Sequence, residues 1–489
     1  MTAAALLLAA WLTPAVWLSI PTLIVDRGPN GLWVGLALIV APLVVLGITA
    51  SRRDAEESEA VFPVVALLFT VGILFWANLS LAGDVSVWLG WPRWYGIAVA
   101  AVGACLLAVV PRAGRLATVL LLVAALGVSV PLFGLARASG VGPIAAWNGV
   151  ANRTAFRFPR SSPWVTDGRD LSATYGRAPI RFDEEHRVTA AAAGRLYAYA
   201  VEGVRVGDLE WTLAPGQSVT FRPGDRIQRH STARLRFESD KRVPGAPTSG
   251  MSWAAGRDLD WPRSVGLVVT VLFGALALCR IGAPVAIPRT MVAFMAGGGL
   301  VVFLWGQSWA VYSLLASPDL FLGSVTAERL LMLPALADDP ARQIFQTSLL
   351  AGGLAAFLAS SVALRHCLAT LDRTGGGEIG RDLGLWSGVI AIAGLGSLWH
   401  FDCWALVLLA LGLAASSVSP VFFGSRMTSS AAVTAAGVVG LVVFLALTAM
   451  GQLQGSADGI LGAILMYPAV IAVPAAALVL WFHRALASR

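Results

Sequence analysis

Long apolar runs separated by short polar connections make up most of this chain, and a single polar stretch interrupts them. A helix needs about 20 apolar residues to cross the hydrocarbon core of a bilayer. Runs near that length predict twelve membrane-spanning helices, over 3–24, 31–50, 60–82, 94–111, 115–136, 264–282, 289–315, 343–366, 384–399, 402–422, 430–451 and 459–482. The polar stretch, 137–263, must lie wholly on one side of the membrane. We therefore expect helices 1–5 in 1–136, an inserted domain in 137–263, and helices 6–12 in 264–489.

The pair of runs around His400 allows two interpretations. The runs are short and almost continuous, so 384–422 forms either one long helix or a hairpin that turns at 399–402. A single helix would invert the orientation of every later segment. The twelve-helix prediction uses the hairpin.

Composition supports a membrane protein. Of 489 residues, 57% are hydrophobic and only 13% are charged, and the mean hydropathy is +0.74. A water-soluble globule with this composition would have too little polar surface to cover itself. The expected class is an integral membrane protein, with the lipid bilayer as its first partner.

The distribution of arginine predicts the orientation. Short loops that carry Arg face the cytoplasm, and with a cytoplasmic N-terminus the inner loops contain Arg52, Arg53, Arg112 and Arg426. Outer connections such as 452–458 are poor in Arg. Both termini are therefore expected in the cytoplasm and 137–263 outside it. All basic residues but one are Arg, and Ala and Gly are abundant, which favours a GC-rich bacterial genome and hence a bacterial inner membrane.

The second half of the insert has the pattern of β-strands. Short segments rich in aromatic and branched residues are typical of strands, and they occur at 194–206, 209–213, 218–222 and 233–239. Pro-Gly pairs at 214–217 and 222–225 predict hairpin-like turns. We expect a small antiparallel sandwich or barrel over 178–245, preceded by an irregular lead-in over 138–177.

Charge and tryptophan are concentrated on the predicted outer side. The stretch 137–263 has 19 basic and 13 acidic residues, or +6 of the chain's net +7. Such a domain is attracted to anionic lipid headgroups or to an acidic protein. Arg226, Arg229 and Arg236 are the candidate anion-binding or partner-binding residues of the insert. No nucleic-acid partner is expected.

Tryptophans gather at the predicted outer rim, and Trp88, Trp91 and Trp94 are the candidates there for partner binding. Trp prefers the headgroup level of a membrane, and it is also enriched at binding hot spots. The rim is therefore either an anchor belt or a docking surface.

The sequence offers little for metal or cofactor chemistry. The insert contains only two histidines, His186 and His230, which are far apart in sequence, and its stretch contains no cysteine. No metal site and no resident cofactor are expected. Ionisable residues are absent from the middle of the apolar runs, which argues against ion-coupled transport. Asn78, Gln307, Gln346 and Tyr467 could line a path for a neutral solute, but such residues also form hydrogen bonds between helices.

The least ordinary segment is Trp-His-Phe-Asp-Cys-Trp at 399–404. It places an imidazole, a carboxylate and a thiol between two indoles at the predicted outer surface, so His400 and Asp402 are candidates for acid–base chemistry. The segment resembles the Trp-rich outer loop of cytochrome c biogenesis haem-handling proteins, although it lacks their tandem tryptophans and following glutamate. That resemblance implies His400 as an axial haem ligand. A polar turn with Trp anchors is the simpler interpretation.

A second outer segment, 317–342, includes a stretch with one apolar side around Leu330. It is expected either to lie in the membrane interface as a roof over the bundle or to form a simple covering loop. Its Glu328 is a further candidate acid–base residue.

Four functions are compatible with this pattern. The first is an integral subunit or assembly factor of a bacterial envelope complex, which binds a membrane or periplasmic protein through the insert and the Trp rim. The second is an outer-face membrane transferase for a lipid-linked substrate, with His400, Asp402 or Glu328 as acid and base. The third is haem handling, and the fourth is transport of a neutral solute. The absence of a recognisable catalytic constellation favours the first.

Overall fold

We analysed a computed structural model of the chain. The structure describes residues 2–33, 37, 40, 61–88, 91–108, 113–159, 187–189, 194–198, 202–206, 208–213, 218–221, 226–229, 235–236, 240, 242–243, 246–255, 261–281, 289–321, 330, 342–371, 379–399, 401, 403–417, 430–454 and 459–487. All structural statements concern these residues.

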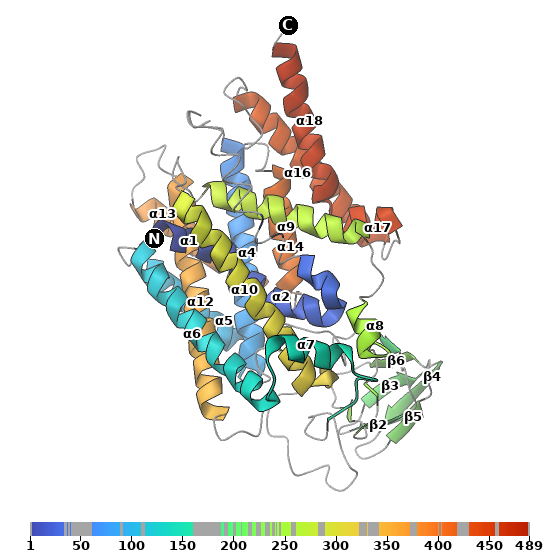
Figure 1. Cartoon of the computed structure of the whole chain (residues 1–489). Coiled ribbons are helices and arrows are strands. Elements are labelled where there is room, and N and C mark those ends of the chain that lie inside the picture. The colour runs from blue at the N-terminus through green and yellow to red at the C-terminus, as the bar shows by residue number, and fades with distance from the viewer. Residues whose placement is uncertain are drawn as a thin grey trace.

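Helices dominate the described chain. They are α1 (Thr2–Trp11), α2 (Pro14–Arg27), the 3-10 helix η1 (Gly28–Gly31), α4 (Val61–Trp88), α5 (Arg93–Ala108), α6 (Ala113–Ser139), α7 (Pro143–Ala151), α8 (Gly250–Ala254), α9 (Trp261–Ile281), α10 (Arg289–Ala316), the 3-10 helix η2 (Pro318–Phe321), α12 (Arg342–Leu371), α13 (Ile379–Gly396), α14 (Cys403–Ser417), α16 (Ser430–Gln454), α17 (Gly459–Met466) and α18 (Ala469–Ala487). Figure 1 shows the strands beside α7 and α8 at one end of the molecule and the C-terminal end of α18 at the other.

Six of the described helices are long and apolar enough to cross a membrane. They contain the candidate spans Val65–Val87, Gly114–Ser139, Val292–Ala316, Thr347–Leu368, Ala431–Leu453 and Ala469–Leu486. The bent pair α1–α2 makes a seventh if it is one span, and α5, α9, α13 and α14 contain shorter apolar helices. The protein is thus a multi-pass helical membrane protein. Twelve spans stay a prediction, and most of 31–50 lies outside the described residues.

The first predicted helix is broken. We expected a continuous helix over 3–24, but α1 and α2 meet at a bend of 53°. Pro14, at the start of α2, has no N–H to continue the hydrogen bonds of α1. The free N–H of Ala15 instead donates to Asn78 Oδ1 of α4 at 3.0 Å, and the Asn78 amide donates to Ser360 Oγ of α12 at 3.4 Å. Asn78 therefore joins α2, α4 and α12 inside the bundle.

The last predicted helix, 459–482, is also divided, into α17 and α18. Pro468 follows Tyr467 at the break and removes a backbone donor there. The Tyr467 hydroxyl, in a side chain that is almost fully buried, accepts a hydrogen bond from Arg27 Nη1 at 3.3 Å. Of the four polar residues considered for a solute path, Asn78 and Tyr467 thus bond to other helices.

The segment 384–422 forms two helices. Cys403, at the start of α14, lies at the Ala77 carbonyl of α4, and Ala414, near its end, packs with Ala66. The residue numbers run in opposite directions, so α14 is antiparallel to α4. Residues 397–399 and 401, between α13 and α14, are not helical, so a single continuous helix is excluded.

Small residues allow the closest helix pair to form. A methyl group built on Gly127 of α6 would approach the Gly352 Cα of α12 to 2.5 Å, and one on Gly134 would meet the Phe345 ring at 2.5 Å. Glycine at these positions lets the two backbones approach, which is how helices associate closely in membranes.

Seven short strands form two antiparallel sheets. They are β1 (Arg187–Thr189), β2 (Gly194–Ala198), β3 (Glu202–Val206), β4 (Leu209–Leu213), β5 (Ser218–Phe221), β6 (Arg226–Arg229) and β7 (Leu235–Arg236). One sheet has the order β1-β6-β3-β4 and the other β5-β2-β7. Within the first, Val204 faces Trp211 across β3 and β4, and Arg205 Nη2 pairs with Glu210 Oε2 at 3.3 Å.

Strand pairing corrects the predicted turns. The Pro-Gly segments at 214–217 and 222–225 lie outside the described residues, but each connects strands that belong to different sheets, so neither closes a hairpin. The predicted run 194–206 likewise divides into β2 and β3 of different sheets. Turn chemistry indicates where a chain reverses, whereas the partner of a strand depends on non-local packing.

The lead-in to the insert also differs from expectation. We predicted an irregular segment over 138–177, but 143–151 forms helix α7. Pro143 occupies its first turn, where a missing N–H costs nothing. Ala146 and Val150 are buried, so packing rather than periodicity stabilises this short helix.

The broken first helix gives a testable prediction. Asn78→Leu removes the acceptor for the buried Ala15 N–H, and an unpaired buried donor costs about 1–3 kcal/mol. We expect a clear fall in the thermal unfolding midpoint of the detergent-solubilised protein.

Thr70→Val is the matched control on the same helix, since the Thr70 hydroxyl donates only within α4, to the Ala66 carbonyl at 2.9 Å. The control should be nearly neutral. Equal effects of the two substitutions would show that the hydrogen bond to Asn78 does not stabilise the bend between α1 and α2.

Candidate functional site

The structure describes only part of the predicted site. His400, Asp402 and Glu328 lie outside the described residues, as do the side chains of Arg226, Arg229, Arg236 and Trp88. Arg226 and Arg229 begin and end β6, and Arg236 ends β7. Trp91 and Trp94 are exposed, and both rings make edge contacts with Tyr95, at centroid distances of 5.4 and 6.0 Å.

The residues that flank His400 and Asp402 lie against α4. Phe401 meets the Trp76 ring edge-on with a centroid distance of 5.1 Å, and the Cys403 thiol lies 3.6 Å from the Ala77 carbonyl oxygen. Trp76 and Ala77 stand at the middle of the candidate span Val65–Val87. We predicted this turn at the outer membrane surface; Phe401 and Cys403 contact α4 before its end, whereas Ser397, on the other flank, contacts Arg93 beyond it.

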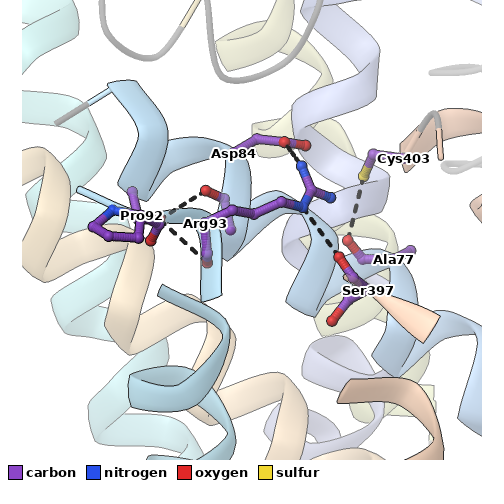
Figure 2. Close-up of polar contacts among 8 residues, drawn as sticks. Ala77, Asp84, Pro92, Arg93, Ser397 and Cys403 are labelled. Atoms are coloured by element: carbon purple, nitrogen blue, oxygen red, sulfur yellow. Dashed lines mark hydrogen bonds and ion pairs between the residues drawn. The ribbon is translucent and has the colours of Figure 1, made fainter. Parts of the chain in front are cut away.

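Arg93 joins this turn to the hairpin of α4 and α5, and Figure 2 shows its contacts. The Arg93 guanidinium forms an ion pair with Asp84 of α4 through Nη1 and Oδ1. Its Nε donates to the Ser397 carbonyl oxygen at 3.0 Å, directly after the end of α13. The side chains of Arg93 and Asp84 are only 10% and 23% exposed. We call Asp84, Arg93 and Ser397 the Arg93 clamp.

Local sequence places Arg93 where it can reach both partners. The Ser86 hydroxyl lies 2.8 Å from the Gly83 carbonyl oxygen and 3.0 Å from that of Pro92, so it can donate to either and holds the turn between α4 and α5. A methyl group on Gly83 would come within 2.9 Å of the Arg93 side chain, and one on Gly96 within 2.3 Å of the Ala82 carbonyl oxygen. Two glycines therefore bring the helices together at the level of the ion pair.

The clamp stabilises the C-terminal end of α13 through charge and a hydrogen bond. The last carbonyls of a helix lack intrahelical partners and carry partial negative charge. Arg93 supplies a cation and a donor to that end of α13, while Asp84 balances its charge. Sequence analysis missed the clamp because it ended one helix at 82 and began the next at 94, which left both residues in a loop. The apolar residues Val85, Val87 and Trp88 were the signal that α4 continues past Asp84.

A second polar cluster lies where the insert leaves the bundle. The two ends of the insert meet in a bridge between Arg157 and Arg242, and the Val243 N–H donates to the Phe156 carbonyl at 2.9 Å. The Gly250 N–H, at the start of α8, donates to the Arg153 carbonyl at 2.7 Å. We call the paired segments 143–158 and 240–254 the neck.

The neck is bonded to the ends of two bundle helices. Arg153 donates from Nη1 to the Leu314 carbonyl at 3.0 Å and from Nη2 to the Leu315 carbonyl at 2.7 Å, at the end of α10. The Trp253 indole donates to the Val25 carbonyl of α2 at 3.0 Å and packs on Trp147. Burial lowers the pKa of Arg153 from its ordinary value, yet arginine stays charged at neutral pH. The neck therefore fixes the base of the insert.

Further chemistry is sparse in the part of the chain that the structure describes. No group of three or more His, Cys, Asp and Glu residues there could hold a metal ion. Cys367 and Cys403 are buried cysteines, and Cys105 is exposed. The fold and the two polar clusters define a multi-pass helical membrane protein in which Arg93, Arg153 and Trp253 bond to the ends of other helices. Comparison with protein-family models and with curated protein sequences found no match for this chain.

The Arg93 clamp predicts that removing the charge of Asp84 lowers the stability of the protein more than removing the charge of an exposed carboxylate does. Asp84→Asn leaves the Arg93 charge partly buried without its counterion, and losing one member of a buried pair costs about 3–5 kcal/mol. Because Asp84 is 23% exposed, we expect a loss near the low end of that range, measured by thermal unfolding in detergent. Replacing both residues by leucine should restore part of the stability.

Glu210→Gln is the control for this prediction. It removes a carboxylate from the Arg205–Glu210 pair, which is about half exposed, and such pairs contribute about 0–1 kcal/mol. If Asp84→Asn changes the unfolding midpoint no more than Glu210→Gln does, the clamp does not stabilise the fold.

The neck makes a separate prediction. Arg153→Met removes both donors from the end of α10, and hydrogen bonds from a charged group contribute about 1.5–3 kcal/mol. We expect amide hydrogen exchange across 143–158 and 246–254 to accelerate at least about tenfold, since 1.4 kcal/mol corresponds to that factor. Arg205→Met, in the exposed pair on the sheet, should leave the neck unchanged. Unaltered exchange in Arg153→Met would contradict the assigned role of Arg153.

Proposed function

We propose that this chain is an integral subunit or assembly factor of a bacterial envelope complex, and that it presents its strand-rich insert to a partner protein. The observation that carries the proposal is the neck. It gathers both ends of the insert at one place and bonds them to α2 and α10 through Trp253 and Arg153.

A fixed base is what a docking module requires. A binding surface held on rigid elements loses less conformational entropy when it meets its partner. Two nearly fully buried rings, Phe156 and Phe158, and the buried Val243 fill the neck, and Phe156 also packs on Phe321 of η2 with a centroid distance of 4.9 Å. We infer that the two sheets above the neck belong to one small sandwich-like domain.

The described surface of the insert has residues suited to protein binding. On β4, Leu209 is 63% exposed and Trp211 is 43% exposed, and both lie on the same side of the strand because side chains alternate. Exposed tryptophan is typical of binding hot spots. The excess of positive charge in 137–263 favours an acidic partner surface.

The side of the membrane on which the insert lies is inferred from the sequence. Arginine-bearing connections alternate with Arg-poor ones in the order that places both termini in the cytoplasm and the insert outside it. The partner is therefore a periplasmic protein or another protein of the inner membrane. Trp91 and Trp94, exposed at the turn between α4 and α5, are a second contact candidate on the Trp rim.

One observation favours a second function. Residues that flank the segment with His400 and Asp402 contact α4 and the Arg93 clamp, and Arg93 lies at the turn between α4 and α5, beside the Trp rim that the sequence places on the outer side. This contact supports an outer-face transferase that acts on a lipid-linked substrate. The two functions differ in their dependence on His400, because only the transferase requires its imidazole.

Partner binding is tested on the intact chain in mild detergent extracts of native membranes. We expect a discrete complex larger than the 51.1 kDa chain in its micelle. The double substitution Leu209→Ser with Trp211→Ser should abolish the complex while the chain itself stays monodisperse, because both side chains are exposed and do not support the core.

Trp481→Ser is the matched control, an exposed aromatic residue of α18 toward the C-terminal end of the chain, opposite the strands (Figure 1). It should leave the complex intact. Recovery of the wild-type chain only as a monomer would overturn the proposal, and so would equal loss of the complex in both variants.

A further inference from the structure

Helix α7 turns sharply away from the candidate span in α6. Gly140 has a φ of 68°, a left-handed conformation that glycine adopts without strain. Its N–H lies 3.2 Å from the carbonyl oxygens of both Ala136 and Arg137, which ends α6. Figure 1 shows α7 running across the end of the bundle rather than along it.

The position of α7 along the bundle follows from its contacts with α10. The Tyr312 hydroxyl donates to the Val141 carbonyl at 2.9 Å, and a methyl group on Gly149 would lie 3.4 Å from the Leu315 side chain. Tyr312 and Leu315 belong to the last turn of the candidate span Val292–Ala316. Helix α7 therefore lies where two spans, those of α6 and α10, both end.

One side of α7 is packed and the other is open. Ala146 and Val150 are buried on the packed side. On the open side Ile144 is 81% exposed, and Val141, just before the helix, is also exposed. This apolar surface continues that of α6, where Phe133 is 71% exposed near the same end.

We propose that Val141 and Ile144 insert into the lipid leaflet at the boundary between headgroups and acyl chains, so that α7 is an interfacial anchor for the neck. The occupant of this surface is lipid, because the surface is continuous with the exposed apolar side of a membrane span. Short helices with one apolar side lie in the interface in this manner. Arg137, exposed in the last turn of α6, is placed to meet anionic headgroup phosphates.

The anchor sets the height of the insert. Because α7 continues directly into Arg153, which is bonded to α10, lipid contact on one side and helix contact on the other hold the same segment. The insert then rests at the leaflet surface rather than on a free tether. This inference does not depend on which partner the insert binds.

Spin-label accessibility tests the anchor without disturbing packed residues. A nitroxide is attached to cysteine introduced at Ile144, in a Cys105→Ser and Cys279→Ser background, with the protein in vesicles of phosphatidylcholine and phosphatidylglycerol. Reference labels replace Leu126, exposed on the span in α6, and Leu209, exposed on β4. Collisions with oxygen report lipid, and collisions with a water-soluble nickel chelate report water.

The ratio of oxygen to nickel collisions at position 144 should exceed that at 209 several-fold and approach that at 126. Two results would overturn the anchor. A ratio equal to that at 209 would place Ile144 in water, and low collision rates with both reagents would show that protein covers it.

Discussion

Every helix end inside a bilayer leaves backbone groups that water cannot satisfy, and this constraint organises the bundle. In the described chain, four ends of membrane helices are bonded by side chains from distant parts of the sequence. Asn78 accepts from the start of α2, Trp253 donates to the end of α2, Arg93 donates just beyond α13, and Arg153 donates to α10. These polar side chains thus form the hydrogen bonds that loops and water form with helix ends at the surface of a soluble protein.

The use of these polar residues in hydrogen bonds between helices argues against a transporter. A transporter requires polar groups that are available to a solute near the middle of the membrane, whereas Asn78 bonds α2 and α12 and Tyr467 accepts from Arg27. The same contacts make the bundle a support of fixed shape, because each bond joins helices far apart in sequence. A support of this kind, with an insert bonded to two of its helices, is better suited to holding a partner than to moving a solute.

The sequence predicted the elements better than their ends. Hydrophobic runs located the long described helices because burial in lipid demands about 20 apolar residues regardless of neighbours. Pro14 and Pro468 were visible signals of broken helices, but the runs on both sides were apolar enough to conceal them. Helix α7 and the assignment of β2 and β3 to different sheets depend on tertiary contacts, which no local pattern contains. The Arg93 clamp could not be predicted for the same reason, since Ser397 is about 300 residues from Arg93 in the sequence.

The Arg93 clamp also bears on the choice between a support and an enzyme. A phosphate near the turn between α13 and α14 would be drawn to Arg93, the cation that bonds to Ser397, but that guanidinium already pairs with Asp84 and donates to the Ser397 carbonyl. Binding of Arg93 to a phosphate would take its positive charge away from the Asp84 carboxylate and from the Ser397 carbonyl in a region of low dielectric. The cost in free energy would be several kcal/mol. Anion binding there would have to exceed this cost before any chemistry began. The clamp is therefore more stable as a closed structural unit than as a binding site, which favours partner binding over transfer chemistry.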